Sequence, residues 1–157
     1  MDLKTEVNGT NTIQISLIDL HPASRGSVTL SSSSPFAAPL IDPGLLTSSI
    51  DLAILREAIR STQRLFSAPV FKTSVFGYVY PPENITTSDE ELDSFIRGEA
   101  SPYLHGGCSA MMSPKGAKWG VVDPDFSVKG VTGLRVVDAS VLVSAMVCLL
   151  FGFWRFN

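Results

Sequence analysis

The sequence predicts an α+β fold in which paired strands are flanked by helices. Three observations carry this prediction. Residues 12–18 alternate polar and apolar side chains, as a half-buried strand does. Two later segments repeat apolar residues at helical spacing, and each follows a serine that can cap a helix. The length of 157 residues corresponds to one domain or to part of one.

The predicted strand pair lies in the first 30 residues. Residues 12–18 form the first strand and residues 27–30 the second, and Pro22 and Gly26 mark the turn between them. We expect these two strands to form a hairpin. Residues 31–47 contain three prolines, so they predict an extended loop without regular structure.

The first helix is predicted to begin at Ser48 or Ser49 and to end before Pro69. Its buried stripe consists of Leu52, Leu55, Ile59 and Phe66.

The second helix is predicted to begin with the capping box formed by Ser88 and Glu91 and to end at Gly98. Its buried face consists of Leu92, Phe95 and Ile96. The acidic run 89–91 could be read as a metal cluster. We interpret it as a first helical turn, which negative charge stabilises through the helix dipole.

Charge and composition exclude several classes of function. The 12 Lys and Arg against 15 Asp and Glu leave a net charge of −3. The chain thus has no excess of positive charge to neutralise nucleic-acid phosphates, and nucleic-acid binding is not expected. The 2 His and 2 Cys lie at positions 21, 105, 108 and 148, a spacing that predicts no metal site. The first residues lack the apolar core of a signal peptide. The uncharged run 139–154 is shorter than the roughly 20 residues of a membrane span, so none is expected.

Two segments carry candidate functional residues. His105 precedes two glycines that let the backbone approach another group closely, and an imidazole acts as a base where a substrate hydroxyl reaches it. Residues 134–137 predict a short strand that ends at Asp138, and the small Ala139 and Ser140 let backbone N–H groups meet a cofactor. The alternatives are a core histidine bound to a backbone partner and an aspartate that caps a turn.

Four motifs together resemble the C-terminal part of the glucose-methanol-choline (GMC) oxidoreductases, most closely the fungal aryl-alcohol-oxidase-like branch. They are LHPASRGSV, APLIDPGLL, the block around His105, and WGVVDPDFSVKGVTGLRVVDASVL. The resemblance covers residues 12–142. It implies an incomplete α+β fold: the substrate-binding layer, an antiparallel sheet with flanking helices, followed by a C-terminal return segment to the flavin domain.

The resemblance also implies a chemistry. The family oxidises the CH–OH group of a small-molecule alcohol with FAD. His105 aligns with the histidine that takes the hydroxyl proton while a hydride passes to the flavin, and the flavin does the redox work. Asp138 and Ala139 match the stretch whose backbone lies against the flavin. Family members of this type are often secreted, and the oligomeric state stays open.

The chain departs from the family pattern in three respects. Cys108 and Ser109 stand where the family has Gly-Thr, no G-x-G-x-x-G occurs, and no polar residue stands near Leu149, where the family has a second catalytic residue. We therefore expect the isolated chain to bind FAD weakly or not at all. Residues 143–157 form an apolar tail unlike the family, for which translation of an intron is one hypothesis.

Four hypotheses of function follow, of which a stand-alone sugar- or alcohol-binding module has the least support. The first is a flavin-dependent alcohol oxidoreductase. The second is a non-catalytic fragment of that family. The third is a membrane-associated or interaction protein that uses its apolar C-terminal tail.

Overall fold

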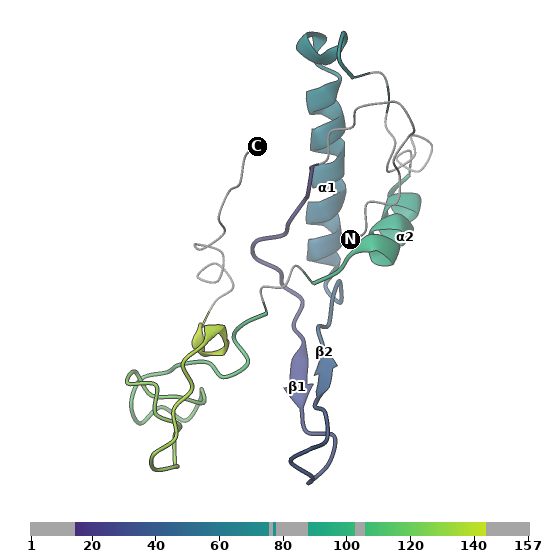
Figure 1. The fold of residues 1–157 in the computed structure, drawn as a ribbon. Helices are drawn as coiled ribbons and strands as arrows, with labels where there is room; N and C mark the ends of the chain where they lie inside the picture. The colour runs from purple at the N-terminus through teal and green to yellow at the C-terminus, as the bar shows by residue number, and fades with distance from the viewer. Residues whose placement is uncertain (1–14, 76, 78–87, 103–105, 144–157) are drawn as a thin grey trace. The chain divides into compact units, whose positions relative to one another are not determined.

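The computed structural model describes residues 15–75, 77, 88–102 and 106–143. Along the chain follow two strands, a long helix, a short 3₁₀ turn, a second helix and a final 3₁₀ turn (Figure 1). The chain divides into two compact units. One comprises Met1–Asp19 with Leu45–Ser101, and the other comprises Leu20–Gly44 with Pro102–Asn157. The antiparallel strand pair and the helices confirm the predicted α+β class.

The strand pair differs from the predicted one. β1 (Ser27–Thr29) pairs antiparallel with β2 (Leu40–Asp42), and Val28 lies opposite Ile41. The prediction that residues 12–18 form β1's partner is wrong for residues 15–18, which are not a strand, while residues 12–14 lie outside the described residues. β2 instead lies within the segment that was predicted to be a loop. Prolines flank this strand and do not interrupt it, and a strand boundary tolerates proline.

Two glycines allow close backbone approach beside the strand pair. A Cβ atom on Gly26 would lie 2.2 Å from the carbonyl oxygen of Asp42, and one on Gly44 would lie 2.2 Å from that of Arg25. Gly44 also has a φ of +58°, which favours glycine, and its N–H donates to the Asp42 carboxylate at 2.8 Å. Both positions therefore require glycine for this hairpin to form.

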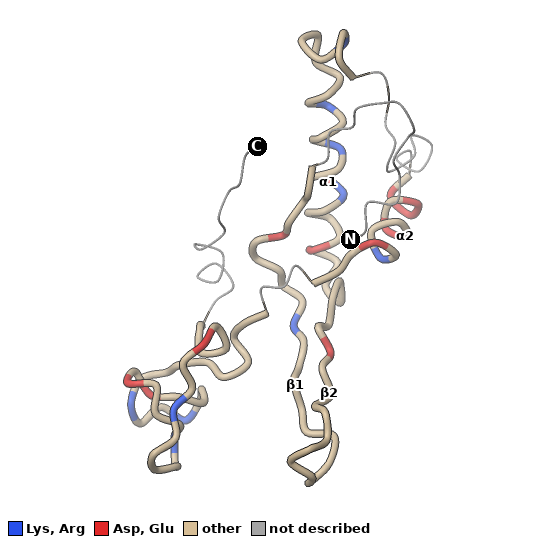
Figure 2. Tube along the Cα trace, in the orientation of Figure 1, with Lys and Arg blue, Asp and Glu red and all other residues tan. Residues whose placement is uncertain are grey.

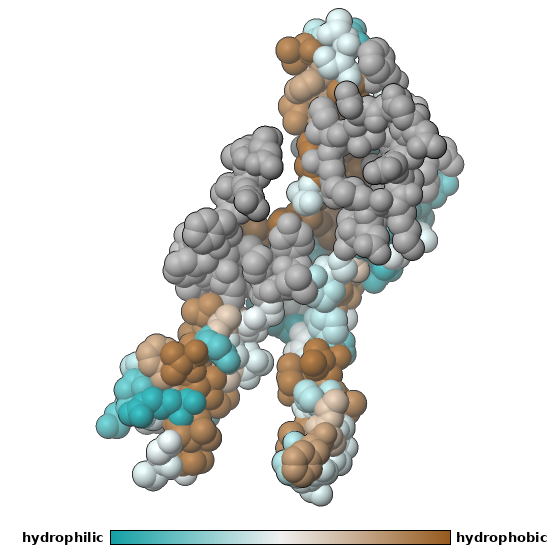
Figure 3. All heavy atoms as spheres, in the orientation of Figure 1, coloured by the Kyte–Doolittle hydropathy of each residue, from teal (hydrophilic) through white to brown (hydrophobic). Residues whose placement is uncertain are grey.

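The hairpin buries little of its apolar surface within the described structure. The exposed fractions of Val28, Leu40 and Ile41 are 55%, 60% and 70%. Figure 3 shows apolar side chains gathered on the surface of this hairpin. Three residue pairs of such a ladder contribute little stability by themselves, because an isolated hairpin is marginal in water.

The two helices begin where their serine caps predict. α1 (Ser49–Phe66) has Ser48 as its N-cap, whose hydroxyl accepts the N–H of Ile50 at 3.3 Å. α2 (Asp89–Glu99) has Ser88 as its N-cap, whose hydroxyl accepts the N–H of Glu91 at 3.1 Å. These bonds satisfy N–H groups that have no partner inside the helix.

The end of α2 differs by one residue from the prediction. Gly98 does not end the helix, which continues through Glu99 to the C-cap Ala100. Ala100 leaves the helix in extended conformation, with φ of −63° and ψ of 133°. An extended exit needs no left-handed residue, so the conformational freedom of Gly98 is not used there.

The core of the first unit lies between α1 and α2. Its buried residues are Leu46, Leu52, Ile59, Leu92 and Ile96, with Leu55, Phe95 and Ala100 partly buried against them. This confirms the predicted apolar faces except at Phe66, which stays outside this cluster and contacts Phe71 edge to face, with ring centroids 5.2 Å apart. The guanidinium of Arg97 donates to the carbonyl of Leu46 at 3.0 Å and so attaches the turn before α1 to α2.

Ion pairs join the polar sides of the two helices. Asp89 pairs with Arg56 and, at 2.5 Å, with Arg60, and Asp93 lies 3.1 Å from Arg56. Figure 2 shows the acidic residues along α2 and the basic ones along α1. The hydrogen bond from Arg60 lowers the pKa of Asp89, and the charges of both arginines add to it. The acidic run 89–91 is therefore a helical first turn, as interpreted from the sequence.

Candidate functional site

The predicted site residues fall in the segment 102–143, which the structure describes from Gly106 onward. His105 lies outside the described residues. Cys108, three residues after it in the chain, begins a segment with hydrogen bonds on two sides. On one side lies the turn that carries Asp138 and Ala139.

Residues 108–112 are attached to this turn by three backbone hydrogen bonds. The N–H groups of Cys108, Ala110 and Met112 donate to the carbonyls of residues 139, 140 and 141 at 3.2, 2.8 and 2.8 Å. The segment is not a strand, because Ser109 and Ala110 form a turn and Cys108 has a φ of +67°. The structure thus brings together the segment that follows His105 and the turn predicted to lie against a cofactor, although 27 or more residues separate them in sequence.

The opposite side of this segment is bonded to residues 121–122. The carbonyl of Met111 accepts the N–H of Val121 at 2.7 Å, and the N–H of Ser113 donates to the carbonyl of Val122 at 3.0 Å. The side chain of Val122 is fully buried and that of Val141 is 5% exposed. Residues 108–113 are therefore bonded to residues 121–122 on one side and to the turn 139–141 on the other, and each of these neighbours carries a buried valine.

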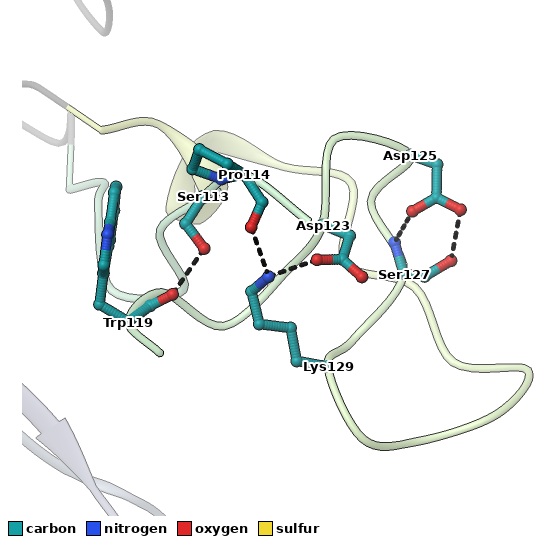
Figure 4. Close-up of polar contacts among 7 residues, drawn as sticks. All are labelled: Ser113, Pro114, Trp119, Asp123, Asp125, Ser127 and Lys129. Carbon is teal, nitrogen blue, oxygen red and sulfur yellow. Dashed lines mark hydrogen bonds and ion pairs between the residues drawn. The ribbon is translucent and has the colours of Figure 1, made fainter. Parts of the chain in front are cut away.

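Ser113 and Trp119 form a polar contact at the end of this segment (Figure 4). Ser113 is 3% exposed, and its hydroxyl donates to the carbonyl of Trp119 at 2.5 Å. The next glycine, Gly120, has a φ of +77°, and a Cβ atom on it would lie 2.6 Å from the Ser113 hydroxyl oxygen. The two residues therefore fit each other only while position 120 has no side chain.

The turn at 123–129 is closed by charged and polar side chains (Figure 4). The Lys129 ammonium pairs with the Asp123 carboxylate and donates to the carbonyl of Pro114 at 3.1 Å. The Asp125 carboxylate accepts the N–H and the hydroxyl of Ser127 at 3.2 and 3.0 Å, which lowers the pKa of Asp125. Each carboxylate thus has a partner inside its own turn. In the part of the chain that the structure describes, no three His, Cys, Asp or Glu gather as metal ligands.

The prediction that residues 134–137 form a strand is wrong. Arg135 forms a single antiparallel pair with Ser127. Hydrogen bonds from Val128 to Leu134 at 3.0 Å and from Val136 to Phe126 at 3.1 Å flank that pair. The ladder stops there because Val137 is 70% exposed and the chain then enters a 3₁₀ turn, so no partner backbone continues beside it.

Asp138 caps this turn, η3 (Ala139–Val141). Its carboxylate accepts the N–H of Ser140 at 2.8 Å, and this hydrogen bond lowers the pKa of Asp138. The capping role, which was the alternative reading of the sequence, is thus present in the structure. Asp138 and Ala139 are both exposed.

Cys108 has a backbone conformation that glycine adopts more easily. Its φ is +67°, in the left-handed region, and its N–H is bonded to Ala139. A left-handed residue with a Cβ atom costs about 1–2 kcal/mol. The departure from the Gly-Thr pattern therefore places a side chain where the backbone favours none.

The sequence reading missed three residues that shape the site: Ser113, Gly120 and Lys129. A glycine between Trp119 and a run of valines was the one available signal, since an isolated glycine in a strand-like run marks close backbone approach. The partners of Ser113 and Lys129 come from other segments, and nothing in the local sequence indicates them.

Comparisons with known proteins identify the family to which the chain belongs. A family model described as GMC oxidoreductase matches residues 22–149. The chain is 54% identical over 132 residues to a pyranose dehydrogenase of Agaricus campestris. The aligned residues make up 84% of this chain and 22% of that protein. The chain thus spans about a fifth of the length of the curated relatives it matches.

Solved structures show the same relationship. A fungal aryl-alcohol oxidase superposes with a TM-score of 0.66 at 33% identity, covering 82% of this chain and 22% of that one. An FAD-dependent oxidoreductase from Chaetomium thermophilum superposes with a TM-score of 0.70 at 33% identity, covering 82% and 23%.

The apolar tail invoked for membrane association lies mostly in residues 144–157, outside the described residues. Within the described ranges, no helix has both the length and the apolar character to cross a membrane.

Proposed function

Because the chain belongs to the GMC oxidoreductase family, we propose that it carries the proton-accepting part of an FAD-dependent oxidoreductase that acts on the CH–OH group of a small alcohol. One observation carries the proposal. Backbone hydrogen bonds at 2.8–3.2 Å attach residues 108–112 to the turn 139–141. The segment next to the candidate base, His105, and the candidate cofactor turn are therefore parts of one small folded layer.

The proposed role of His105 is to accept the hydroxyl proton of the substrate. A neutral imidazole does so near neutral pH, since the ordinary pKa of histidine is about 6.5. As the O–H bond weakens, negative charge grows on the oxygen, and the carbinol C–H bond becomes a better hydride donor. When bound, FAD supplies the acceptor for that hydride. General-base catalysis of this kind contributes about 10²–10⁴-fold in rate.

The turn at Asp138 and Ala139 suits a flat cofactor ring. Both residues are exposed, and Ala139 presents only a methyl group, so a ring could approach its backbone closely. The Asp138 carboxylate is bonded to the N–H of Ser140, which keeps the turn ordered. The fit thus rests on access and small size, together with the match of these two residues to the family motif.

The substrate class we propose is a pyranose sugar. The support is the identity of 54% to a pyranose dehydrogenase, against 33% to the solved aryl-alcohol oxidase. A benzylic alcohol is the competing substrate, and the rates of oxidation of the sugar and of the benzylic alcohol are compared in the same assay.

A chimera tests the role of His105. The matched 132-residue segment of the Agaricus campestris enzyme is replaced by the corresponding residues of this chain. In this chimera, His105→Ala is expected to lower kcat about 10²–10⁴-fold while flavin absorbance is retained. The matched control is His21→Ala, which changes the other histidine of the chain. Full turnover in the His105→Ala chimera, with flavin bound, contradicts the proposal.

The second candidate is a family member that does not catalyse. Cys108 favours it, because a side chain there meets a strained φ of +67° beside the proposed site. The 157-residue chain is mixed with FAD, and flavin absorbance and alcohol oxidation are measured. We expect weak or no binding. Stoichiometric flavin, with turnover that His105→Ala abolishes, would show that the chain is a self-sufficient enzyme.

A further inference from the structure

We propose that Ser113 is a positioning residue, whose buried hydroxyl holds residues 108–112 in register on the turn 139–141. The inference rests on the proposed function in one respect: it is through that function that this register matters, because His105 lies three residues before Cys108 in the chain. The hydrogen bonding itself is independent of any cofactor or substrate.

Ser113 is bonded through both backbone and side chain. Its N–H donates to the carbonyl of Val122 at 3.0 Å, and its hydroxyl donates to the carbonyl of Trp119 at 2.5 Å. At 3% exposure, neither bond can be exchanged for a bond to water without moving the chain. Ser113 thus links the end of the segment 108–113 to residues on both sides of Gly120.

Gly120 makes this attachment specific. A Cβ atom there would lie 2.6 Å from the Ser113 hydroxyl oxygen, 2.7 Å from its Cβ atom and 2.8 Å from the carbonyl oxygen of Met111. Ser113 therefore packs directly on the backbone of Gly120. Sliding the segment by one residue would put Met112 or Pro114 in this narrow space, and neither side chain fits there.

The register at this end sets the register at the other. Ser113 directly follows Met112, the last of the three donors, so a shift of the chain at Ser113 moves the Met112 N–H away from the carbonyl of residue 141. The bonds from Cys108, Ala110 and Met112 to residues 139–141 all depend on one register. The Ser113 hydroxyl adds a side-chain hydrogen bond to the neighbouring backbone, so it discriminates between positions of the segment in a way that the backbone bonds cannot.

The test uses the full 157-residue chain without flavin or substrate. Amide hydrogen exchange is followed by NMR for the wild type, Ser113→Ala and the control Ser127→Ala. The control removes another serine hydroxyl of the same unit, one bonded to Asp125. Because no flavin is present, this result and that of the His105 chimera can fail separately.

In Ser113→Ala, we expect the N–H groups of Cys108, Ala110 and Met112 to exchange about tenfold faster, with the amides of α1 and α2 unchanged. Ser127→Ala is expected to leave these three amides unaffected. Unchanged exchange in Ser113→Ala overturns the proposal. So does equal loss of protection over all of residues 106–143, which would make Ser113 a residue of general stability.

Discussion

Replacing Gly120 with alanine is expected to destabilise the unit that contains the candidate site. The new Cβ atom would lie 2.6, 2.7 and 2.8 Å from the Ser113 hydroxyl oxygen, the Ser113 Cβ atom and the Met111 carbonyl oxygen. All three distances are shorter than real contacts of a Cβ atom. The Ser113 hydroxyl is bonded to the carbonyl of Trp119, and the Met111 carbonyl accepts the N–H of Val121. These two groups therefore cannot move away without breaking hydrogen bonds.

The magnitude has two parts. A residue with a Cβ atom at a φ of +77° costs about 1–2 kcal/mol relative to glycine. Overpacking of a tight contact costs about 1–3 kcal/mol more. The free energy of unfolding should therefore fall by about 2–5 kcal/mol, a large share of the roughly 5–15 kcal/mol that stabilises a typical domain.

Gly130→Ala is the matched control. Gly130 has nearly the same φ, +76°, in the same unit, but a Cβ atom there meets nothing within 4 Å. It should therefore show the backbone cost of about 1–2 kcal/mol without the steric one. Both variants are unfolded in urea in a Trp154→Phe background, so that Trp119 fluorescence reports on this unit. Equal losses of stability in the two variants, within about 0.5 kcal/mol, would refute the argument from steric contact.

Three further predictions concern local stability. Cys108→Gly should be more stable than Cys108→Ala by about 1 kcal/mol in thermal unfolding, since only glycine relieves the φ of +67°; a less stable glycine variant would contradict the strain. Asp89→Asn should remove a loss of helix content that the wild type shows below about pH 4. The depressed pKa of Asp89 means that its carboxylate stabilises the fold above its unfolded pKa and stops doing so as pH falls through the folded one. The control Glu90→Gln should keep that acid transition. If the transition disappears in Glu90→Gln as well, the helix dipole and not the arginine pairs of Asp89 would be its cause. Ser88→Ala should cost about 1 kcal/mol of stability by urea unfolding, because it removes the cap of α2, whereas the exposed Ser94→Ala should cost less than half of that; equal costs would argue against the cap.

The helices show how far local sequence reaches in this protein. The sequence predicted Ser88 as one cap and Ser48 or Ser49 as the other, because a hydroxyl two or three residues before a backbone N–H can bond to it without any help from the rest of the fold. The apolar faces followed from spacing for the same reason. Phe66 is the exception, because its position near the end of α1 puts it beyond the reach of α2 and beside Phe71 instead.

The strand pairing shows where local sequence fails. The segments 12–18 and 27–30 have the right patterns for strands, but a strand needs a partner, and pairing energy does not depend on the pattern of one strand alone. The partner of β1 is three residues long and lies between two prolines, which made it resemble a loop. The glycine contacts beside Asp42 and Arg25 that favour this pairing exist only once the two backbones have met.

For the candidate site, the sequence by itself determined the family, the residue types and their order along the chain: His105, then Cys108 where glycine is usual, then Asp138 and Ala139. These are properties of residues close in sequence, and motifs record them directly. Only the tertiary structure decided that residues 108–112 lie on the turn 139–141 and that Ser113 and Gly120 lie in direct contact. The first of these contacts joins backbone groups, which every residue carries alike, and the second joins a serine side chain to a residue that has none. The type of residue at a position does not predict such contacts, which exist only when separate segments fold together.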